Sequence, residues 1–232
     1  MSQLGGSSLP GGGISTRPLH LILLADCSGS MATNGGERIQ ALNFAVASML
    51  PHLAAWELEQ GEASVLVRVL AFAAEPVWHL GHPTPVGEVR WKRLQVVEGE
   101  RGWRTNFGAA LSTAADVLSP ANLERRALRP ALVLITDGQA SDASTGGYDV
   151  GLAALDAVPA GRSALRVAVA IGDEPDTSEL TRFVGNGDVP VLRASRVDEI
   201  ADHLVAVSIA VSRMSESGVD RRSVAQGILG PR

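Results

Sequence analysis

Short apolar runs recur along the chain, and stretches with a helical pattern separate them. Some of these runs, such as 131–136 and 165–171, are almost continuously apolar, which is typical of parallel strands covered by helices on both faces. Strands that alternate with helices connect through right-handed crossovers and build a doubly wound sheet. The sequence therefore predicts an α/β fold with a mainly parallel central sheet flanked by helices. The expected strands are 19–25, 64–73, 131–136, 165–171 and 189–193.

Three stretches place apolar residues at the spacing of one helix face, which predicts amphipathic helices. They cover about 39–53, 107–118 and 197–211. Pro51 is expected to kink the first helix, because proline removes a backbone hydrogen bond and crowds the preceding turn. A cap residue followed three positions later by an acid indicates two helix starts. These are Ser195 with Asp198 and Asp176 with Glu179.

The chain of 232 residues is long enough for one sizeable domain, which we expect at 18–214. Residues 1–17 are rich in Gly, Ser and Pro, so they are expected to form a flexible lead. Helical periodicity is lost at 215–232, which predicts a loosely docked or disordered tail. Inside the domain the stretch 75–102 is irregular, and only a short hairpin is expected there.

Charge and composition argue against several classes of function. The formal net charge of −5 argues against nucleic acid as the main partner, because phosphate binding needs a clustered basic surface. The one lysine, Lys92, follows Trp91 and not glycine, so a Walker A loop is excluded. The run 19–25 is too short to cross a bilayer. A single cysteine, Cys27, fits a reducing compartment. We therefore expect a cytoplasmic protein with no membrane partner.

Polar residues with hard oxygen atoms follow two of the expected strands. Asp26, Ser28 and Ser30 come directly after the run 19–25, and Asp137 ends the run 131–136. Ligands of doubly wound sheets bind beyond the carboxyl ends of the strands, where both acids arrive. Alternate residues of an extended segment point the same way, so the first three residues are expected to converge on one ion. Thr105, in the loop before the second helix, would add a third hydroxyl.

Oxygen-only donors suit magnesium, manganese or calcium, whereas thiolate and imidazole would suit zinc. Two carboxylates and three neutral hydroxyls form a weak cage for a divalent cation. Magnesium commonly completes its shell from a bound ligand. The ion would therefore be under-neutralised at the surface and would favour an acidic group from a partner.

The three separated elements, with Asp26 to Ser30, Thr105 and Asp137 in this order, resemble the metal-ion-dependent adhesion site of von Willebrand factor A domains. The resemblance covers about residues 18–212. It implies a Rossmann-like, non-enzymatic domain that binds magnesium or manganese through Asp26, Ser28, Ser30, Thr105 and Asp137. It also implies that an Asp or Glu of a protein partner supplies the last ligand.

Softer features resemble the bacterial branch associated with tellurite resistance and stress operons (TerY-like and YegL-like proteins). They lie at 36–43, 107–111 and 171–173. This resemblance implies association with products of the same operon, such as a kinase or phosphatase. Trp103-Arg104 departs from the pattern, because small glycines would be expected before Thr105, and it could narrow access to the ion or shape the choice of partner.

Several residues near these elements have two readings each. Asp142 either supports a metal ligand or is an ordinary loop acid. Arg101 and Arg104 either attract an acidic partner or are solvated loop charges, and Trp103 is either an exposed anchor or packs beneath its loop. The pair His79 and His82 has no cysteine nearby, so a zinc site is not expected there. Cys27 is expected to be a small buried packing residue.

Two alternatives to an interaction module stay open. The first is a metal-dependent phosphohydrolase of the haloacid dehalogenase type, which would carry a second Asp as general acid two residues after Asp26. Ser28 stands there, and its hydroxyl cannot act as an acid near neutral pH, so no enzyme is expected. The second alternative is a scaffold whose ion is purely structural.

Overall fold

The computed structural model describes residues 17–60, 63–172, 176–185 and 190–194, together with 199–200, 202–204 and 206–207. Residues 1–16 of the expected lead and the expected tail 215–232 lie outside these ranges. The described residues include no helix that is both long enough and apolar enough to cross a membrane.

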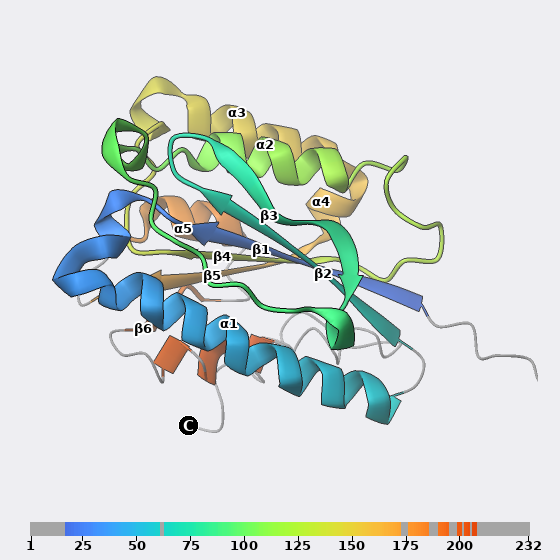
Figure 1. Ribbon diagram of the computed structural model, residues 1–232. Coiled ribbons are helices and arrows are strands. Elements are labelled where there is room, and N and C mark those ends of the chain that lie inside the picture. Colours follow the sequence, from blue (N-terminus) through green and yellow to red (C-terminus); the bar gives the residue numbers. More distant parts are fainter. Residues whose placement is uncertain are drawn as a thin grey trace, which may run out of the picture.

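Six strands form one sheet in the order β3-β2-β1-β4-β5-β6 (Figure 1). All neighbouring pairs are parallel except β2 and β3, which are antiparallel. The predicted α/β fold with a mainly parallel sheet is confirmed. The strands are β1 (Arg17–Asp26), β2 (Ala63–Phe72), β3 (Pro76–Pro85), β4 (Ala131–Thr136), β5 (Leu165–Ile171) and β6 (Leu192–Ala194).

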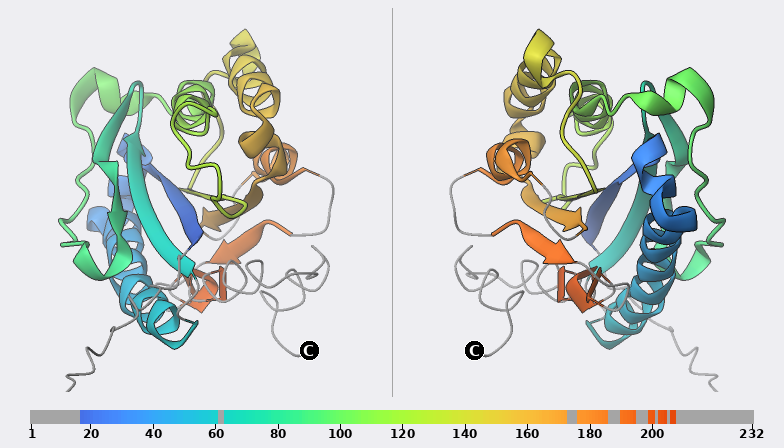
Figure 2. Two further views of the ribbon diagram at one scale, coloured as in Figure 1. Left: turned by 90° about the vertical axis from the view of Figure 1, so that its right-hand side faces the viewer. Right: turned by 90° about the vertical axis from the view of Figure 1, so that its left-hand side faces the viewer.

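Helices cover both faces of the sheet (Figure 2). The long helix α1 lies on one face, while α2 and α3 lie on the other, with the short helices α4 and α5 beside them. The helices are α1 (Thr33–Gln60), α2 (Phe107–Val117), α3 (Gly147–Ala157), α4 (Pro159–Ser163) and α5 (Ser178–Val184). Short 3-10 turns are η1 (Gly29–Ala32), η2 (Val86–Glu88), η3 (Gly99–Trp103) and η4 (Ala143–Thr145).

The central strand β1 shows why its sequence is apolar throughout. Its residues are buried from Leu19 to Asp26, because β2 and β4 flank it and helices cover both faces. Leu21 and Leu23 join the core on the α1 side, and Ile22 and Leu24 join the core on the α2 side. A strand of this kind presents one side chain in two to each face, so both sets must be apolar.

The first predicted helix is longer than expected. It continues through Pro51 to Gln60, although a kink was expected at that proline. Pro51 is exposed, so the carbonyl that loses its amide partner can be hydrated. The expected short hairpin in 75–102 is instead the full antiparallel strand β3, and β6 begins later than the predicted strand 189–193.

Two further differences concern helices. Helix α3 was not predicted, and α5 begins at Ser178, with Asp176 accepting a hydrogen bond from the Ser178 amide at 2.9 Å. The described parts of the third predicted helix are helical at 199–200, 202–204 and 206–207. Within them Ile200, Leu204 and Val207 are buried on the α1 side. The expected start at Ser195 and the end of this helix lie outside the described residues.

Candidate metal centre

The carboxylate of Asp26 lies at the carboxyl edge of the sheet, where β1 ends. Its side chain is fully buried, and each oxygen accepts one hydrogen bond. Oδ1 accepts from the Ser28 amide at 2.8 Å, and Oδ2 accepts from the Thr136 hydroxyl at 2.6 Å. Burial raises the pKa of Asp26 to about 6, although both hydrogen bonds oppose that rise. A carboxylate removed from water in this way is stabilised by a nearby cation.

The chain turns sharply after Asp26, and this turn brings two hydroxyls together. Ser28 precedes the 3-10 turn η1, which contains Ser30, so these residues converge through a helical turn and not through the extended alternation expected from the sequence. The two hydroxyl oxygens lie 3.0 Å apart. Cys27 instead points into the core, where burial raises the pKa of its thiol to about 12, and it is the packing residue that was predicted.

Asp137, directly after β4, completes this group of oxygens. Its Oδ1 accepts a hydrogen bond from the Ser30 hydroxyl at 2.7 Å. Its Oδ2 forms an ion pair with Arg38 of α1. The side chain of Asp137 is completely covered, whereas that of Arg38 is 30% exposed. Arg38 was not predicted at the site, because nothing in the local sequence indicates that it reaches a residue so far along the chain.

Thr105 lies in the loop between η3 and α2. Its amide donates to the Ser141 hydroxyl at 2.8 Å, and its carbonyl accepts from the Ser141 amide at 2.9 Å. The next residue, Asn106, donates its amide to the carbonyl of Ala73, just after β2. These bonds hold Thr105 between the end of β2 and the loop that follows β4. Its side-chain hydroxyl has no hydrogen-bond partner among the residues that the structure describes.

The chemistry of the five candidate donors suits a hard divalent cation. Magnesium binds oxygen at about 2.1 Å in octahedral geometry, which places neighbouring ligands roughly 3 Å apart. The spacing of 3.0 Å between the Ser28 and Ser30 hydroxyls matches this value. All five donors are oxygens, and two are carboxylates. The described residues contain no group of three or more His, Cys, Asp or Glu side chains placed to hold a metal. A site here therefore depends on its hydroxyls.

Asp142 hydrogen-bonds none of the five predicted ligands within the described residues. Its Oδ2 accepts a hydrogen bond from the Gly108 amide at 2.8 Å, which satisfies one of the free amides at the start of α2. Its Oδ1 is buried and has no partner within the described residues. Asp142 thus positions the helix that follows Thr105.

The other residues singled out in the sequence lie in the loop before Thr105 and in strand β3. Trp103 is 78% exposed, and Arg101 and Arg104 beside it are exposed too, so the tryptophan does not pack beneath its loop. His79 hydrogen-bonds the carbonyl of Lys92 at 2.7 Å and stacks edge-on against Trp91. These contacts give His79 a structural role in holding the segment 89–98.

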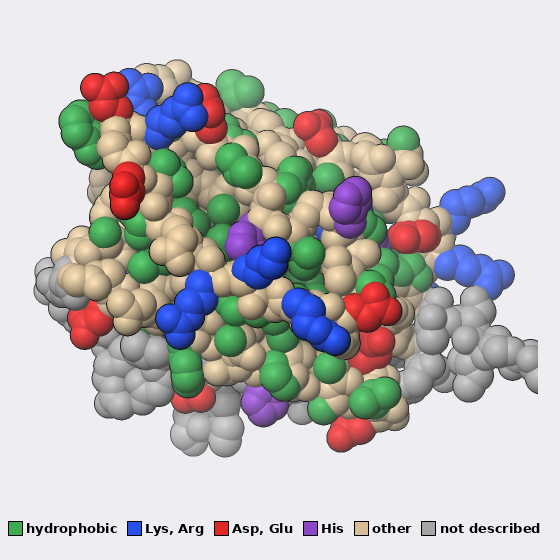
Figure 3. Space-filling model, viewed as in Figure 1, with side chains coloured by type: hydrophobic (Ala, Val, Ile, Leu, Met, Phe, Trp, Pro, Cys, Tyr) green, Lys and Arg blue, Asp and Glu red, His purple; other side chains and the backbone are tan. Residues whose placement is uncertain are grey.

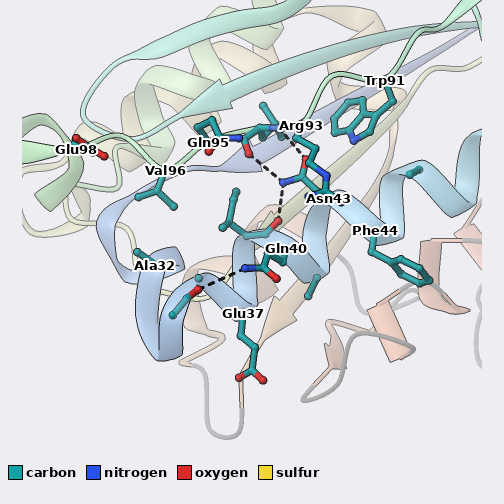
Figure 4. A pocket seen from close by; sticks show the side chains of 16 residues that line it. Ala32, Glu37, Gln40, Asn43, Phe44, Trp91, Arg93, Gln95, Val96 and Glu98 are labelled. Carbon is teal, nitrogen blue, oxygen red and sulfur yellow. Dashed lines mark hydrogen bonds between the residues drawn. The ribbon is translucent and has the colours of Figure 1, made fainter.

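A groove lies next to the site, between the first half of α1 and the extended segment 89–98 (Figure 4). Its volume is about 800 Å³. Asn43 lies in the middle of this groove and hydrogen-bonds the backbone of Leu94 through both ends of its amide. Glu37, Arg93 and Glu98 line it with mixed charge. The groove therefore has no single-sign charge that would define one ligand.

The face of the molecule seen in Figure 3 carries interspersed acidic and basic side chains. Hydrophobic side chains appear between them in small groups.

Residues 21–139 match the von Willebrand factor type A domain family (VWA_2). The match covers just over half of the chain and includes all five candidate ligands. The chain therefore belongs to the von Willebrand factor type A domain family. A search of curated proteins found no match.

Solved structures share the fold at low sequence identity. Proximal thread matrix protein 1 from the mussel byssus, described with a zinc occupied MIDAS motif, has a TM-score of 0.61 and 17% identity. The comparison covers 85% of this chain and 48% of that chain. A von Willebrand factor type A protein from Catenulispora acidiphila has a TM-score of 0.62 and 16% identity, and covers 85% and 43%. The pilus adhesin SpaC from Lactobacillus rhamnosus GG has a TM-score of 0.61 and 16% identity, and covers 85% and 31%. This chain thus spans less than half the length of each.

Proposed function

We propose that the chain is a metal-dependent protein-interaction module without enzymatic activity. The observation that carries the proposal is the continuous set of oxygens formed by Ser28, Ser30 and Asp137 at the carboxyl edge of the sheet. Two loops from different strands deliver them, as ligand sites in such folds require. Von Willebrand factor A domains are typically interaction modules, which supports the same function.

The proposed ligands are Asp26, Ser28, Ser30, Thr105 and Asp137. Magnesium is the proposed ion, with manganese or calcium as alternatives, because hard oxygen donors suit all three. The zinc in the similar mussel protein supports divalent binding in this fold without selecting the ion. Each carboxylate oxygen of Asp26 and Asp137 keeps a further lone pair beside the hydrogen bond or ion pair that it already makes, so these acids would act on the ion directly or through water.

The proposed partner is a protein that supplies an Asp or Glu to the ion. The exposed Trp103, two residues before Thr105, supports an interface here, because tryptophan is favoured where protein partners bind tightly. We further propose a cytoplasmic role in a bacterial stress-response or tellurite-resistance assembly, with an operon-encoded kinase or phosphatase as partner. That context rests on the resemblance of 36–43, 107–111 and 171–173. The proposed domain spans 18–214.

The phosphohydrolase alternative finds no support in the site. Ser28 occupies the position of the general acid, and its hydroxyl is already paired with that of Ser30. A purely structural ion is the other alternative. It predicts that removal of the metal lowers folding stability more than it weakens partner binding.

Metal binding tests the proposed site directly. Titration of the purified protein with Mn²⁺ by calorimetry is expected to show one site, and Thr105→Ala is expected to weaken it at least about tenfold, because one ligand is lost. Thr113→Ala is the matched control. Its hydroxyl bonds only the Ala109 carbonyl within α2, so its affinity for Mn²⁺ should equal that of the wild type. Equal affinities for all three proteins would exclude Thr105 from the site.

Partner capture tests the function. A pull-down from native lysate with Mg²⁺, and in parallel with EDTA, is expected to retain a partner only with Mg²⁺. Asp26→Ala should abolish that retention. A partner that both the EDTA sample and Asp26→Ala retain would contradict metal-dependent adhesion, and turnover of a generic phosphoester would favour the phosphohydrolase.

A further inference from the structure

The carboxylate of Asp137 is held by two different elements. Oδ1 accepts from Ser30 at 2.7 Å, and Oδ2 pairs with Arg38 in the second turn of α1. The carboxylate is fully covered and the arginine is 30% exposed, so water screens this ion pair only in part. One of the two negative charges proposed for the metal site is therefore already balanced by the protein.

The fold is shaped to keep the guanidinium in this place. Gly172 follows β5 with φ of +120°, a conformation that residues with a side chain rarely adopt. A Cβ at this position would lie 3.4 Å from Nη2 of Arg38. The guanidinium thus fills the space beside Gly172 on one side and contacts Asp137 on the other.

Charge balance then sets the properties of the site. Asp26 and Asp137 together would bring two negative charges to a divalent cation, but the positive charge of Arg38 balances one of them. A cation held in this way keeps a net positive charge. It binds less tightly to the protein, and it attracts an external carboxylate more strongly.

We propose that Arg38 is a specificity-determining residue that weakens metal binding and strengthens the binding of an acidic group to the metal. This inference rests on the proposed function, because it requires the metal site to exist. It adds a prediction that the five ligands alone do not make, since metal affinity and carboxylate affinity should change in opposite directions when Arg38 is neutralised.

Arg38→Gln tests this inference with Mn²⁺ and acetate as probes. Calorimetry is expected to show Mn²⁺ binding about tenfold more tightly than in the wild type. Acetate binding to the Mn²⁺-loaded protein, followed by paramagnetic relaxation of ¹³C-acetate, is expected to weaken about fivefold. Arg38→Lys keeps the charge, so both constants should stay near the wild-type values.

Arg104→Gln is the matched control. It removes the same charge beside Thr105, and the Arg104 side chain has no hydrogen bond or ion pair within the described part of the chain. Both constants should change less than twofold. Mn²⁺ binding to Arg38→Gln that is unchanged or weaker, or acetate binding that is unchanged or tighter, would overturn the role of Arg38 alone. A wild-type protein that binds no Mn²⁺ would overturn the proposed site as well.

Discussion

At the scale of the residue, Asn43 shows how one buried amide fixes a segment that belongs to no helix or strand. Its Nδ2 donates to the carbonyls of Ile39 at 2.8 Å and Leu94 at 3.0 Å, and its Oδ1 accepts from the Leu94 amide at 2.8 Å. Leu94 is itself buried, so these backbone groups cannot turn to water instead. Asn43 therefore replaces the backbone pairing that a strand would provide.

Replacement of Asn43 by alanine is expected to lower the free energy of unfolding by about 2–4 kcal/mol, because it leaves the buried amide and carbonyl of Leu94 without partners. Urea unfolding measures the change. Gln40→Ala is the control on the same helix, since Gln40 is exposed and makes one bond of 3.4 Å to Gly35. The control should change the free energy by less than about 0.5 kcal/mol. Equal effects of the two substitutions would show that the segment 89–98 is held by other contacts.

At the scale of the element, α2 and α3 approach each other through glycines. A Cβ on Gly151 would lie 2.2 Å from the carbonyl oxygen of Gly108, and one on Gly108 would lie 2.0 Å from that of Gly147. The close contact allows Tyr148 of α3 to reach the carbonyl of Glu179 in α5 at 2.6 Å. The two helices therefore cover the sheet as one unit. The loop that contains Thr105 leads directly into the first of them, α2.

The substitution Gly151→Ala is expected to destabilise the protein by about 2–4 kcal/mol, because the added methyl group meets backbone atoms that cannot move aside. Helix propensity alone predicts the opposite sign, a gain of about 1 kcal/mol. Thermal and urea unfolding decide between the two. Gly87→Ala, at a position where a Cβ meets nothing within 4 Å, serves as control and should leave stability nearly unchanged. A stabilised Gly151→Ala protein would mean that α2 and α3 are not in contact at these glycines.

At the scale of the whole molecule, buried polar side chains lie at both ends of the sheet. At the end away from the candidate metal site, buried His20 bonds Arg68 through Nδ1 at 3.0 Å and Glu124 through Nε2 at 2.7 Å. Arginine can only donate, so Nδ1 must accept and the single proton of neutral histidine lies on Nε2. Burial lowers the pKa of His20, and Arg68 lowers it further against the opposing effect of Glu124.

Acid is therefore expected to destabilise the fold through His20. Its pKa is lower in the folded protein than in the unfolded chain, so its contribution is complete above about pH 6.5 and is lost as the pH falls. Between pH 7.5 and 5.5 the free energy of unfolding should fall more steeply in the wild type than in His20→Gln, which keeps both hydrogen-bonding directions without titrating. The difference is limited to about 1.4 kcal/mol per pH unit.

Urea unfolding at each pH measures both slopes. Asp26, whose raised pKa has the opposite sign, titrates alike in the two proteins and cancels from the difference. Glu124, whose pKa is lowered by its bond to His20 despite the opposing burial, titrates below this range. Parallel slopes for the two proteins would contradict the assignment of acid sensitivity to His20.

The sequence allowed the parallel strands to be predicted, because burial on both faces leaves a local pattern, and the five candidate ligands stay a prediction. Other features depend on contacts between distant segments. Helix α3 was not predicted, and the close packing of its Gly151 against Gly108 depends on a distant segment of the chain. Arg38 lies 99 residues from Asp137, and no spacing in the sequence indicates their ion pair.

The central place of β1 has a consequence for how the protein is made. This strand is synthesised before the other five strands of the sheet, its neighbour β4 and the acid after β4 come much later, and Ser30 meets Asp137 across 107 residues. A nascent chain emerges from the ribosome from its N-terminus. Until β4 and Asp137 have been synthesised, the edge of β1 that pairs with β4 stays unpaired, and Ser30 has no carboxylate partner. The proposed site would therefore be complete only late in translation, because a chain interrupted before Asp137 would carry the other four candidate ligands but would lack the second carboxylate.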